Sequence, residues 1–86
     1  MKIIDVRTKE EYDAGHIEGA LLFDVEDIKK GAFPDVDKNE AITLYCQSGY
    51  RSMMAKSFLE KAGFTNVTNG GGIDKLTSEL KKNDRI

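Results

Sequence analysis

Short apolar runs alternate along the chain with stretches whose apolar residues recur at helical spacing. The runs, each typical of a β-strand, lie at residues 3–6, 20–23, 41–45 and 66–68, and the helical stretches lie at residues 9–14, 25–30, 52–62 and 73–82. This alternation predicts an α/β fold, a small, mostly parallel β-sheet flanked by helices on both faces. The third run is nearly continuous in apolar and β-branched residues, so we place that strand centrally in the sheet.

Local signals mark the ends of several elements. Thr8 and Glu11 have the spacing of a capping box at a helix start, and Gly15 suits a left-handed cap at the end of the same short helix. Residues 69–72, Asn-Gly-Gly-Gly, are expected to form a tight loop. The apolar stripes that should face the core are Met54, Phe58 and Ala62 on the third helix, with Ala55 and Leu59 beside them, and Ile73, Leu76 and Leu80 on the last.

Length and composition fit one globular domain spanning residues 1–86. The chain has 86 residues, of which 40% are hydrophobic and 33% charged, a mixture typical of folded chains. No apolar run approaches the roughly 20 residues of a membrane span and no secretory signal is visible, so we expect a cytoplasmic protein with no membrane partner. Cys46 is the only cysteine and His16 the only histidine, which argues against a four-ligand zinc site and leaves Cys46 as a free thiol.

Charge is unevenly distributed along the chain. Residues 1–43 carry six basic and eleven acidic side chains, a net −5, whereas residues 44–86 carry seven basic and four acidic ones, a net +3. No basic cluster is dense enough to predict a nucleic-acid partner. The half that contains Cys46 is the half in which an anion would be better tolerated.

Residues 45–52, Tyr-Cys-Gln-Ser-Gly-Tyr-Arg-Ser, carry the candidate chemistry. Cys46 follows a buried strand, and the C-terminal edge of such strands is where open α/β sheets bind ligands. Gly49 can adopt a positive φ, which lets successive backbone N–H groups curl into an anion-binding nest, and the next helix directs its N-terminus at the same spot. With the cation of Arg51, these features favour thiolate, so the pKa of Cys46 should lie below its ordinary value.

The alternative is that Cys46 is a small buried hydrophobe, the usual role of a lone cysteine after an apolar strand. The combination of Gly49, Arg51 and the helix start favours the anion site over this interpretation. The glycines of residues 69–72 should let the backbone pass close to the cysteine loop. A nucleophile activated by such a loop needs no neighbouring general base.

Cys-x-x-Gly-x-Arg-Ser at residues 46–52 resembles the active-site loop of rhodanese-homology (sulfurtransferase) domains. The resemblance covers nearly the whole chain: residues 4–7 resemble the family's opening strand, residues 15–20 (Gly-His-Ile-Glu-Gly-Ala) its Gly-His-Ile-Pro-Gly-Ala motif, and residues 63–72 its closing segment. The chain departs from the family in three ways. It begins at what resembles the family's second strand, so the usual N-terminal strand and helix are short or absent; Glu18 replaces the usual proline; and no tryptophan is present.

The resemblance implies that Cys46 is the catalytic nucleophile, which takes a sulfane sulfur and holds it as a persulfide. The substrate-binding residues would be Gln47, Ser48, Gly49, Tyr50, Arg51 and Ser52, through their backbone N–H groups and the Ser52 hydroxyl. A small anion such as thiosulfate would donate the sulfur, and a thiol, cyanide or a protein would accept it, with no metal or cofactor. Family members that favour thiosulfate often carry a basic residue in the loop, whereas here Arg51 is the only loop cation, so we expect weak thiosulfate binding.

Three other functions stay open. A cysteine phosphatase uses a similar cradle, but it needs a longer loop than the four residues that separate Cys46 from Arg51. A non-catalytic or sulfur-relay module would keep the fold and dock a partner or pass sulfur to it. A redox sensor would exploit a readily oxidised thiolate, although no second cysteine is present to resolve a sulfenate.

The remaining polar and sulfur-containing side chains are expected to be structural. His16 lies in a turn and should form a hydrogen bond there, and Asp5 and Arg7 should pair near the first strand. Met53 and Met54 should fill the core. Lysines on the last helix, at residues 75, 81 and 82, predict a solvated face.

Overall fold

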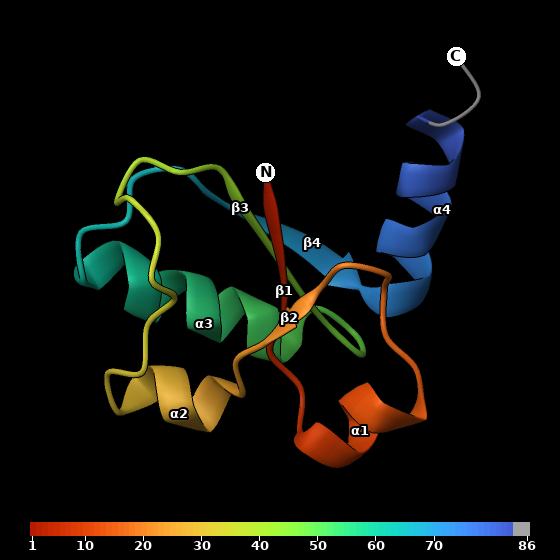
Figure 1. The fold of residues 1–86 in the computed structure, drawn as a ribbon, viewed down its shortest axis with the longest axis horizontal. Helices are drawn as coiled ribbons and strands as arrows, with labels where there is room; N and C mark the ends of the chain where they lie inside the picture. Colours follow the sequence, from red (N-terminus) through yellow and green to blue (C-terminus); the bar gives the residue numbers. More distant parts are fainter. Residues whose placement is uncertain (84–86) are drawn as a thin grey trace.

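The computed structural model describes residues 1–83, which build a four-stranded parallel sheet with helices on both faces (Figure 1). Strands and helices alternate in the order β1 (Lys2–Asp5), α1 (Lys9–Ala14), β2 (Leu21–Leu22), α2 (Val25–Lys29), β3 (Ile42–Cys46), α3 (Tyr50–Lys61), β4 (Val67–Gly72) and α4 (Ile73–Asn83). The predicted α/β fold is confirmed. Among residues 1–83, no helix has the length and apolar content needed to cross a bilayer.

The order of the strands, β2-β1-β3-β4, makes β3 an interior strand, as expected. β1 pairs in parallel with β3 from Lys2 opposite Ile42 to Asp5 opposite Tyr45. From β1 the chain crosses to β2 on one side, and from β3 it crosses to β4 on the other. The carboxyl ends of β1 and β3 therefore meet where the strand order reverses, which is the point at which open α/β sheets bind ligands.

Side chains of β3 alternate between the two faces of the sheet. Ile42, Leu44 and Cys46 join the larger core cluster, which contains buried residues of α2 and α3. Tyr45 lies on the other face, where it packs with Leu76 of α4. Every residue of β3 is buried, because helices cover the strand on both sides. The sequence signal of a continuous apolar run therefore located the central strand correctly.

Residues 69–72 do not form the tight loop that the sequence predicts. They continue β4 to Gly72, which pairs with Cys46 across an irregularity in the register. Glycine and asparagine are poor strand formers, so tertiary pairing overrides local preference here. The expected close passage beside the cysteine loop is confirmed, because a Cβ on Gly72 would lie 2.6 Å from the carbonyl oxygen of Gln47.

The apolar face of α3 was predicted correctly, but its centre lies on Ala55 and Leu59, which were predicted beside the stripe, and not on the stripe itself. Its fully buried residues are Ser52, Ala55 and Leu59, with Met54, Phe58 and Ala62 partly buried beside them. Met53, expected in the core, is 52% exposed. The displacement arises because the polar Ser52 occupies an interior position near Cys46, which apolar periodicity does not register. The inward stripe of α4, formed by Ile73, Leu76 and Leu80, is confirmed.

The start of α1 also agrees with the sequence signals. The capping box of Thr8 and Glu11 is present. Gly15 follows the helix with φ of 154° and ψ of 131°, which is not the left-handed helical cap that we expected. His16 forms structural contacts, as expected. Its Nδ1 lies 2.8 Å from the Tyr12 carbonyl oxygen, and its ring stacks on that of Tyr12.

At Gly70, β4 packs closely against its neighbours. A Cβ at this position would lie 2.9 Å from the carbonyl oxygen of Leu44 and 3.1 Å from Cδ2 of Leu76. We expect Gly70→Ala to lower the free energy of unfolding by about 1–3 kcal/mol, the usual cost of overpacking an interior. Thr68→Ala, at an exposed position of the same strand, should change it by less than about 1 kcal/mol. Urea unfolding of both variants measures the difference, and equal losses would contradict this view of the packing.

Candidate active site

Cys46 ends β3, and its side chain is fully buried. The loop of residues 47–49 turns back over it, so that the backbone N–H of Gly49 donates to Sγ across 2.9 Å. The hydroxyl of Ser52 lies 3.6 Å from the same sulfur atom. Figure 1 shows this loop, in green, between the first turn of α4 and α1. The sulfur is thus held by main-chain and hydroxyl groups at the reversal point of the sheet.

The conformation of Gly49 makes this turn possible. Its φ of 100° and ψ of −9° lie in the left-handed region, and it is the N-cap of α3. The first hydrogen bond of the helix runs from Met53 N–H to the Gly49 carbonyl oxygen over 3.1 Å. The N–H groups of Tyr50, Arg51 and Ser52 precede that bond, so they have no acceptor within the helix. The positive end of the α3 dipole therefore lies at the cysteine loop, as predicted.

The pKa of Cys46 lies below its ordinary value even though the thiol is buried. Burial raises this pKa, because a low-dielectric interior disfavours the charged form. Hydrogen bonds from the Ser52 hydroxyl and from the backbone N–H groups of Ser52, Ser48 and Gly49 lower it by more. The direction agrees with the sequence-based expectation, and the responsible groups are those of the loop and the helix start.

Asn69 of β4 also belongs to this site, although sequence analysis did not identify it. Its Oδ1 accepts hydrogen bonds from the Ser52 hydroxyl at 2.6 Å and from the Gly71 N–H at 2.9 Å. Its Nδ2 donates to the Gly49 carbonyl oxygen at 3.2 Å. Asn69 thereby ties β4 to the start of α3. Its position at the carboxyl end of a parallel strand could have identified Asn69 as a site residue, but the glycines that follow it predict a loop instead of a strand.

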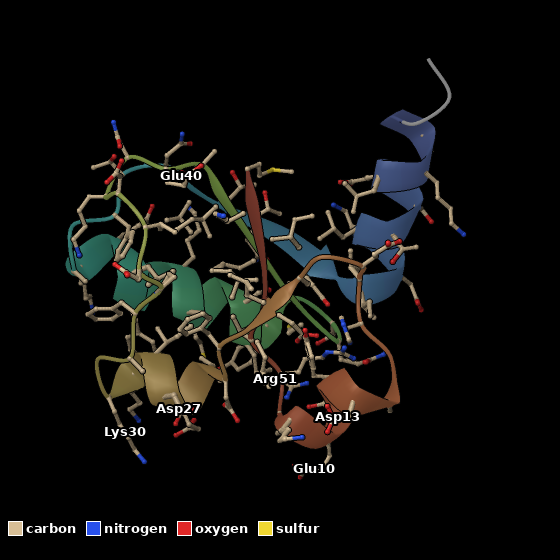
Figure 2. The ribbon with its side chains drawn as sticks, in the orientation of Figure 1. Glu10, Asp13, Asp27, Lys30, Glu40 and Arg51 are labelled. Atoms are coloured by element: carbon tan, nitrogen blue, oxygen red, sulfur yellow. The ribbon has the colours of Figure 1, made fainter. Side chains whose placement is uncertain are left out.

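Arg51 is not a free cation beside the sulfur, which revises the expected charge of the loop. Its guanidinium donates to both carboxylate oxygens of Glu11 in α1, with Nη1–Oε1 at 2.7 Å and Nη2–Oε2 at 2.9 Å. Figure 2 shows the labelled Arg51 next to α1. The hydrogen bond from Arg51 is the main reason that the pKa of Glu11 falls to about 2. The backbone N–H of Arg51, in contrast, remains at the helix start beside the loop.

The outer side of the loop is formed by Gln47, Ser48 and Tyr50, all exposed. Tyr50 is 65% exposed, so it lies at the rim and does not pack in the core. The Gln47 amide oxygen accepts a hydrogen bond from Nη1 of Arg7 at 3.3 Å. Arg7 is itself paired with Asp5, Nη2 to Oδ2 at 2.7 Å, which confirms the predicted pair.

A separate cavity of about 310 Å³ lies between the turn after α1 and α4. Its lining residues are His16, Ile17, Glu18, Ile73, Thr77, Leu80 and Lys81. No residue of the cysteine loop lines it. The candidate site is therefore defined by the hydrogen bonds around Cys46 and not by this cavity.

Ser52 provides a test of how the thiolate is stabilised. We expect Ser52→Ala to raise the pKa of Cys46, because one hydrogen bond to the charged form is lost. The rate of alkylation by iodoacetamide near neutral pH should fall by about threefold to tenfold, and its pH profile should shift to higher pH. Ser57→Ala, on the exposed side of α3, is the matched control. An unshifted profile in Ser52→Ala would exclude a role for the hydroxyl.

Comparisons with known proteins connect this geometry to sulfur chemistry. The Rhodanese-like domain family matches residues 1–79. The thiosulfate sulfurtransferase PspE of Escherichia coli K12 is 38% identical over 74 residues, which cover 85% of this chain and 71% of that protein. The putative sulfur carrier protein YrkF of Bacillus subtilis is 38% identical over 69 residues, covering 80% of this chain and 37% of that protein. A solved E. coli rhodanese with anions has a TM-score of 0.79 at 36% identity, covering 86% of this chain and 88% of that structure. This chain belongs to the rhodanese-like domain family.

Proposed function

We propose that this protein is a sulfurtransferase that moves a sulfane sulfur from thiosulfate or a related donor to a thiophilic acceptor through a persulfide on Cys46. The observation that carries the proposal is the hydrogen bond of 2.9 Å from the Gly49 N–H to Sγ, at the head of α3. The relatives support it, because PspE is named a thiosulfate sulfurtransferase and the similar E. coli rhodanese was solved with anions.

In the first half-reaction, the Cys46 thiolate attacks the outer sulfur of thiosulfate. A bond forms between Sγ and that sulfur, the S–S bond of thiosulfate breaks, and sulfite leaves with the electron pair. The outer sulfur of the resulting persulfide is negatively charged, and the N–H groups of residues 47–51 and the Ser52 hydroxyl stabilise it. No proton is transferred, so the reaction needs no general base.

In the second half-reaction, an acceptor thiolate or cyanide attacks the outer sulfur, and the Cys46 thiolate leaves. The scheme predicts ping-pong kinetics, because each half-reaction releases its product before the next reactant binds. Cys46 is fully buried, so a donor reaches it only when the structure around the sulfur opens locally. The cytoplasm suits this chemistry, because it keeps thiols reduced.

A sulfur-relay role is the second candidate, and the similarity to the putative sulfur carrier YrkF favours it. A relay protein would load Cys46 from another protein and react poorly with free thiosulfate. The phosphatase interpretation has less support, because Arg51 is paired with Glu11 and is not free to bind a phosphate. The sensor interpretation also has less support, because the sequence has no second cysteine to resolve a sulfenate.

Intact-mass analysis tests the persulfide directly. We expect the native chain incubated with thiosulfate to gain the mass of one sulfur atom and to lose it on addition of cyanide. Cys46→Ser should gain nothing, because the nucleophile is absent. A native chain that never gains sulfur from thiosulfate but accepts it from a persulfide-bearing protein would favour the relay.

Gln47→Arg tests whether loop side chains face the donor. The new guanidinium would be repelled by Arg7, whose Nη1 now donates to Gln47, and would turn outward on the exposed side of the cysteine loop. We expect the Michaelis constant for thiosulfate to fall by about threefold to tenfold, because an added cation attracts a dianion. Thr65→Arg adds the same charge at an exposed position two residues before β4, at the end of that strand opposite to the cysteine loop, and should leave the constant unchanged. An unchanged constant in Gln47→Arg would show that this side chain does not meet the donor.

A further inference from the structure

Both arginines beside the cysteine loop are bound to carboxylates that follow or end β1. Arg7 donates to both oxygens of Asp5 through Nε, at 3.0 and 3.1 Å, and through Nη2 at 2.7 Å to Oδ2. Arg51 donates to both oxygens of Glu11. The sequence indicated a loop with one unmatched cation, whereas in the structure each of these cations faces a carboxylate across two or more hydrogen bonds.

Glu11 is held in place independently of Arg51. Its Oε1 accepts hydrogen bonds from the Thr8 N–H at 3.2 Å and from the Thr8 hydroxyl at 3.1 Å, as part of the capping box of α1. The capping box fixes the position of this carboxylate by contacts that do not involve α3. Glu11 thus has two partners, the start of its own helix and a residue of the cysteine loop forty positions further along the chain.

Arg51 immediately precedes Ser52 in the first turn of α3, and the Ser52 hydroxyl lies 3.6 Å from the sulfur. The charges of Arg51 and Glu11 therefore act on the region around the sulfur. Both side chains are 32% exposed, so solvent screens their charges only in part. Besides Glu11, the charge of the Cys46 thiolate contributes to the raised pKa of Arg51. A guanidinium within reach of the thiolate also attracts a donor anion, and a dianion is attracted about twice as strongly as a monoanion. Glu11 opposes that attraction.

We propose that Glu11 is a specificity-determining residue, which neutralises Arg51 and thereby removes the advantage that a dianionic sulfur donor would have over a monoanionic one. The loop then takes sulfane sulfur from monoanionic donors, such as thiosulfonates and persulfide anions, as readily as from thiosulfate. Glu11 acts through Arg51 and does not touch the donor. This inference rests on the proposed sulfurtransferase function.

Glu11→Gln, assayed with two matched donors, tests the inference. Thiosulfate and methanethiosulfonate both carry an outer sulfur on an oxidised sulfur atom, but they bear charges of −2 and −1. Attack by the Cys46 thiolate on either one gives the same persulfide and releases sulfite or methanesulfinate with the electron pair. The glutamine keeps an oxygen that can accept from Thr8 and Arg51, so the charge is removed with little change of shape.

We expect the ratio of kcat/KM for thiosulfate to that for methanethiosulfonate to rise by about fivefold to tenfold in Glu11→Gln, with cyanide as acceptor. The change should appear mainly in the Michaelis constant for thiosulfate, with kcat nearly constant, because Glu11 affects binding of the charged donor. In an Arg51→Gln background, the same substitution should leave the ratio unchanged, because the cation that Glu11 neutralises is gone.

Glu79→Gln is the matched control. It removes the same charge from another ion pair, Lys75 Nζ to Glu79 Oε1 at 2.8 Å, and the Lys75 side chain lies against Gly71 beside the loop. Both partners are well exposed, so solvent screens their charges. We expect the ratio of the two donors to change by less than about twofold.

Three results would overturn the inference. These are equal changes for both donors in Glu11→Gln, a rise in the Michaelis constant for thiosulfate, or an equal shift of the ratio in Glu79→Gln.

If Glu11→Gln does not fold, as judged by circular dichroism, the native protein gives the test. Its Michaelis constant for thiosulfate should change by less than about twofold between low and physiological salt, and a steep dependence would reveal an unmatched cation. A native protein that loads sulfur from neither donor would instead refute the sulfurtransferase function itself.

Discussion

The parallel pairing of β1 with β3 is the constraint on which the candidate site depends. It sets Asp5 opposite Tyr45, so the segments that follow the two strands leave the sheet at the same edge. Arg7 can then reach Gln47, and Glu11 can reach Arg51, although each pair is separated by forty positions in the chain. The cysteine loop is therefore anchored at both ends by the chain that follows β1, and not only by the helix that it precedes.

Within this frame, the state of the thiol reflects two opposing effects. Burial disfavours the thiolate, and donors from the loop, the start of α3 and the Ser52 hydroxyl favour it. The single proton of the Ser52 hydroxyl has three competing acceptors, which are Oδ1 of Asn69 at 2.6 Å, the Gly49 carbonyl oxygen at 3.1 Å and the sulfur at 3.6 Å. Asn69 holds the Ser52 hydroxyl toward β4, whereas a negative charge on the sulfur attracts the hydroxyl proton away from Asn69. The backbone N–H groups need no such rearrangement, so they provide the constant part of the stabilisation.

Most of the fold and the centre of the site could be predicted from local pattern. The continuous apolar run marked β3, the spacing of Thr8 and Glu11 marked the capping box, and Gly49 adopts the positive φ that its place in the loop required. The features that escaped prediction depend on contacts between distant segments. Asn69 lies in a strand that exists only because β4 pairs with β3, and an arginine at a helix start gives no indication of which carboxylate will match it.

The enclosure of the sulfur has a consequence for how such a loop can change over time. The hydrogen-bond donors to Sγ belong largely to the main chain, while the side chains of Gln47, Ser48 and Tyr50 are exposed. Ser48 and Tyr50, whose side chains do not anchor the loop as Gln47 does, can be substituted without altering the geometry that polarises the cysteine. Recognition of an acceptor and activation of the nucleophile are thus separable within one short segment, and the outer surface can adapt to new acceptors while the inner one stays the same.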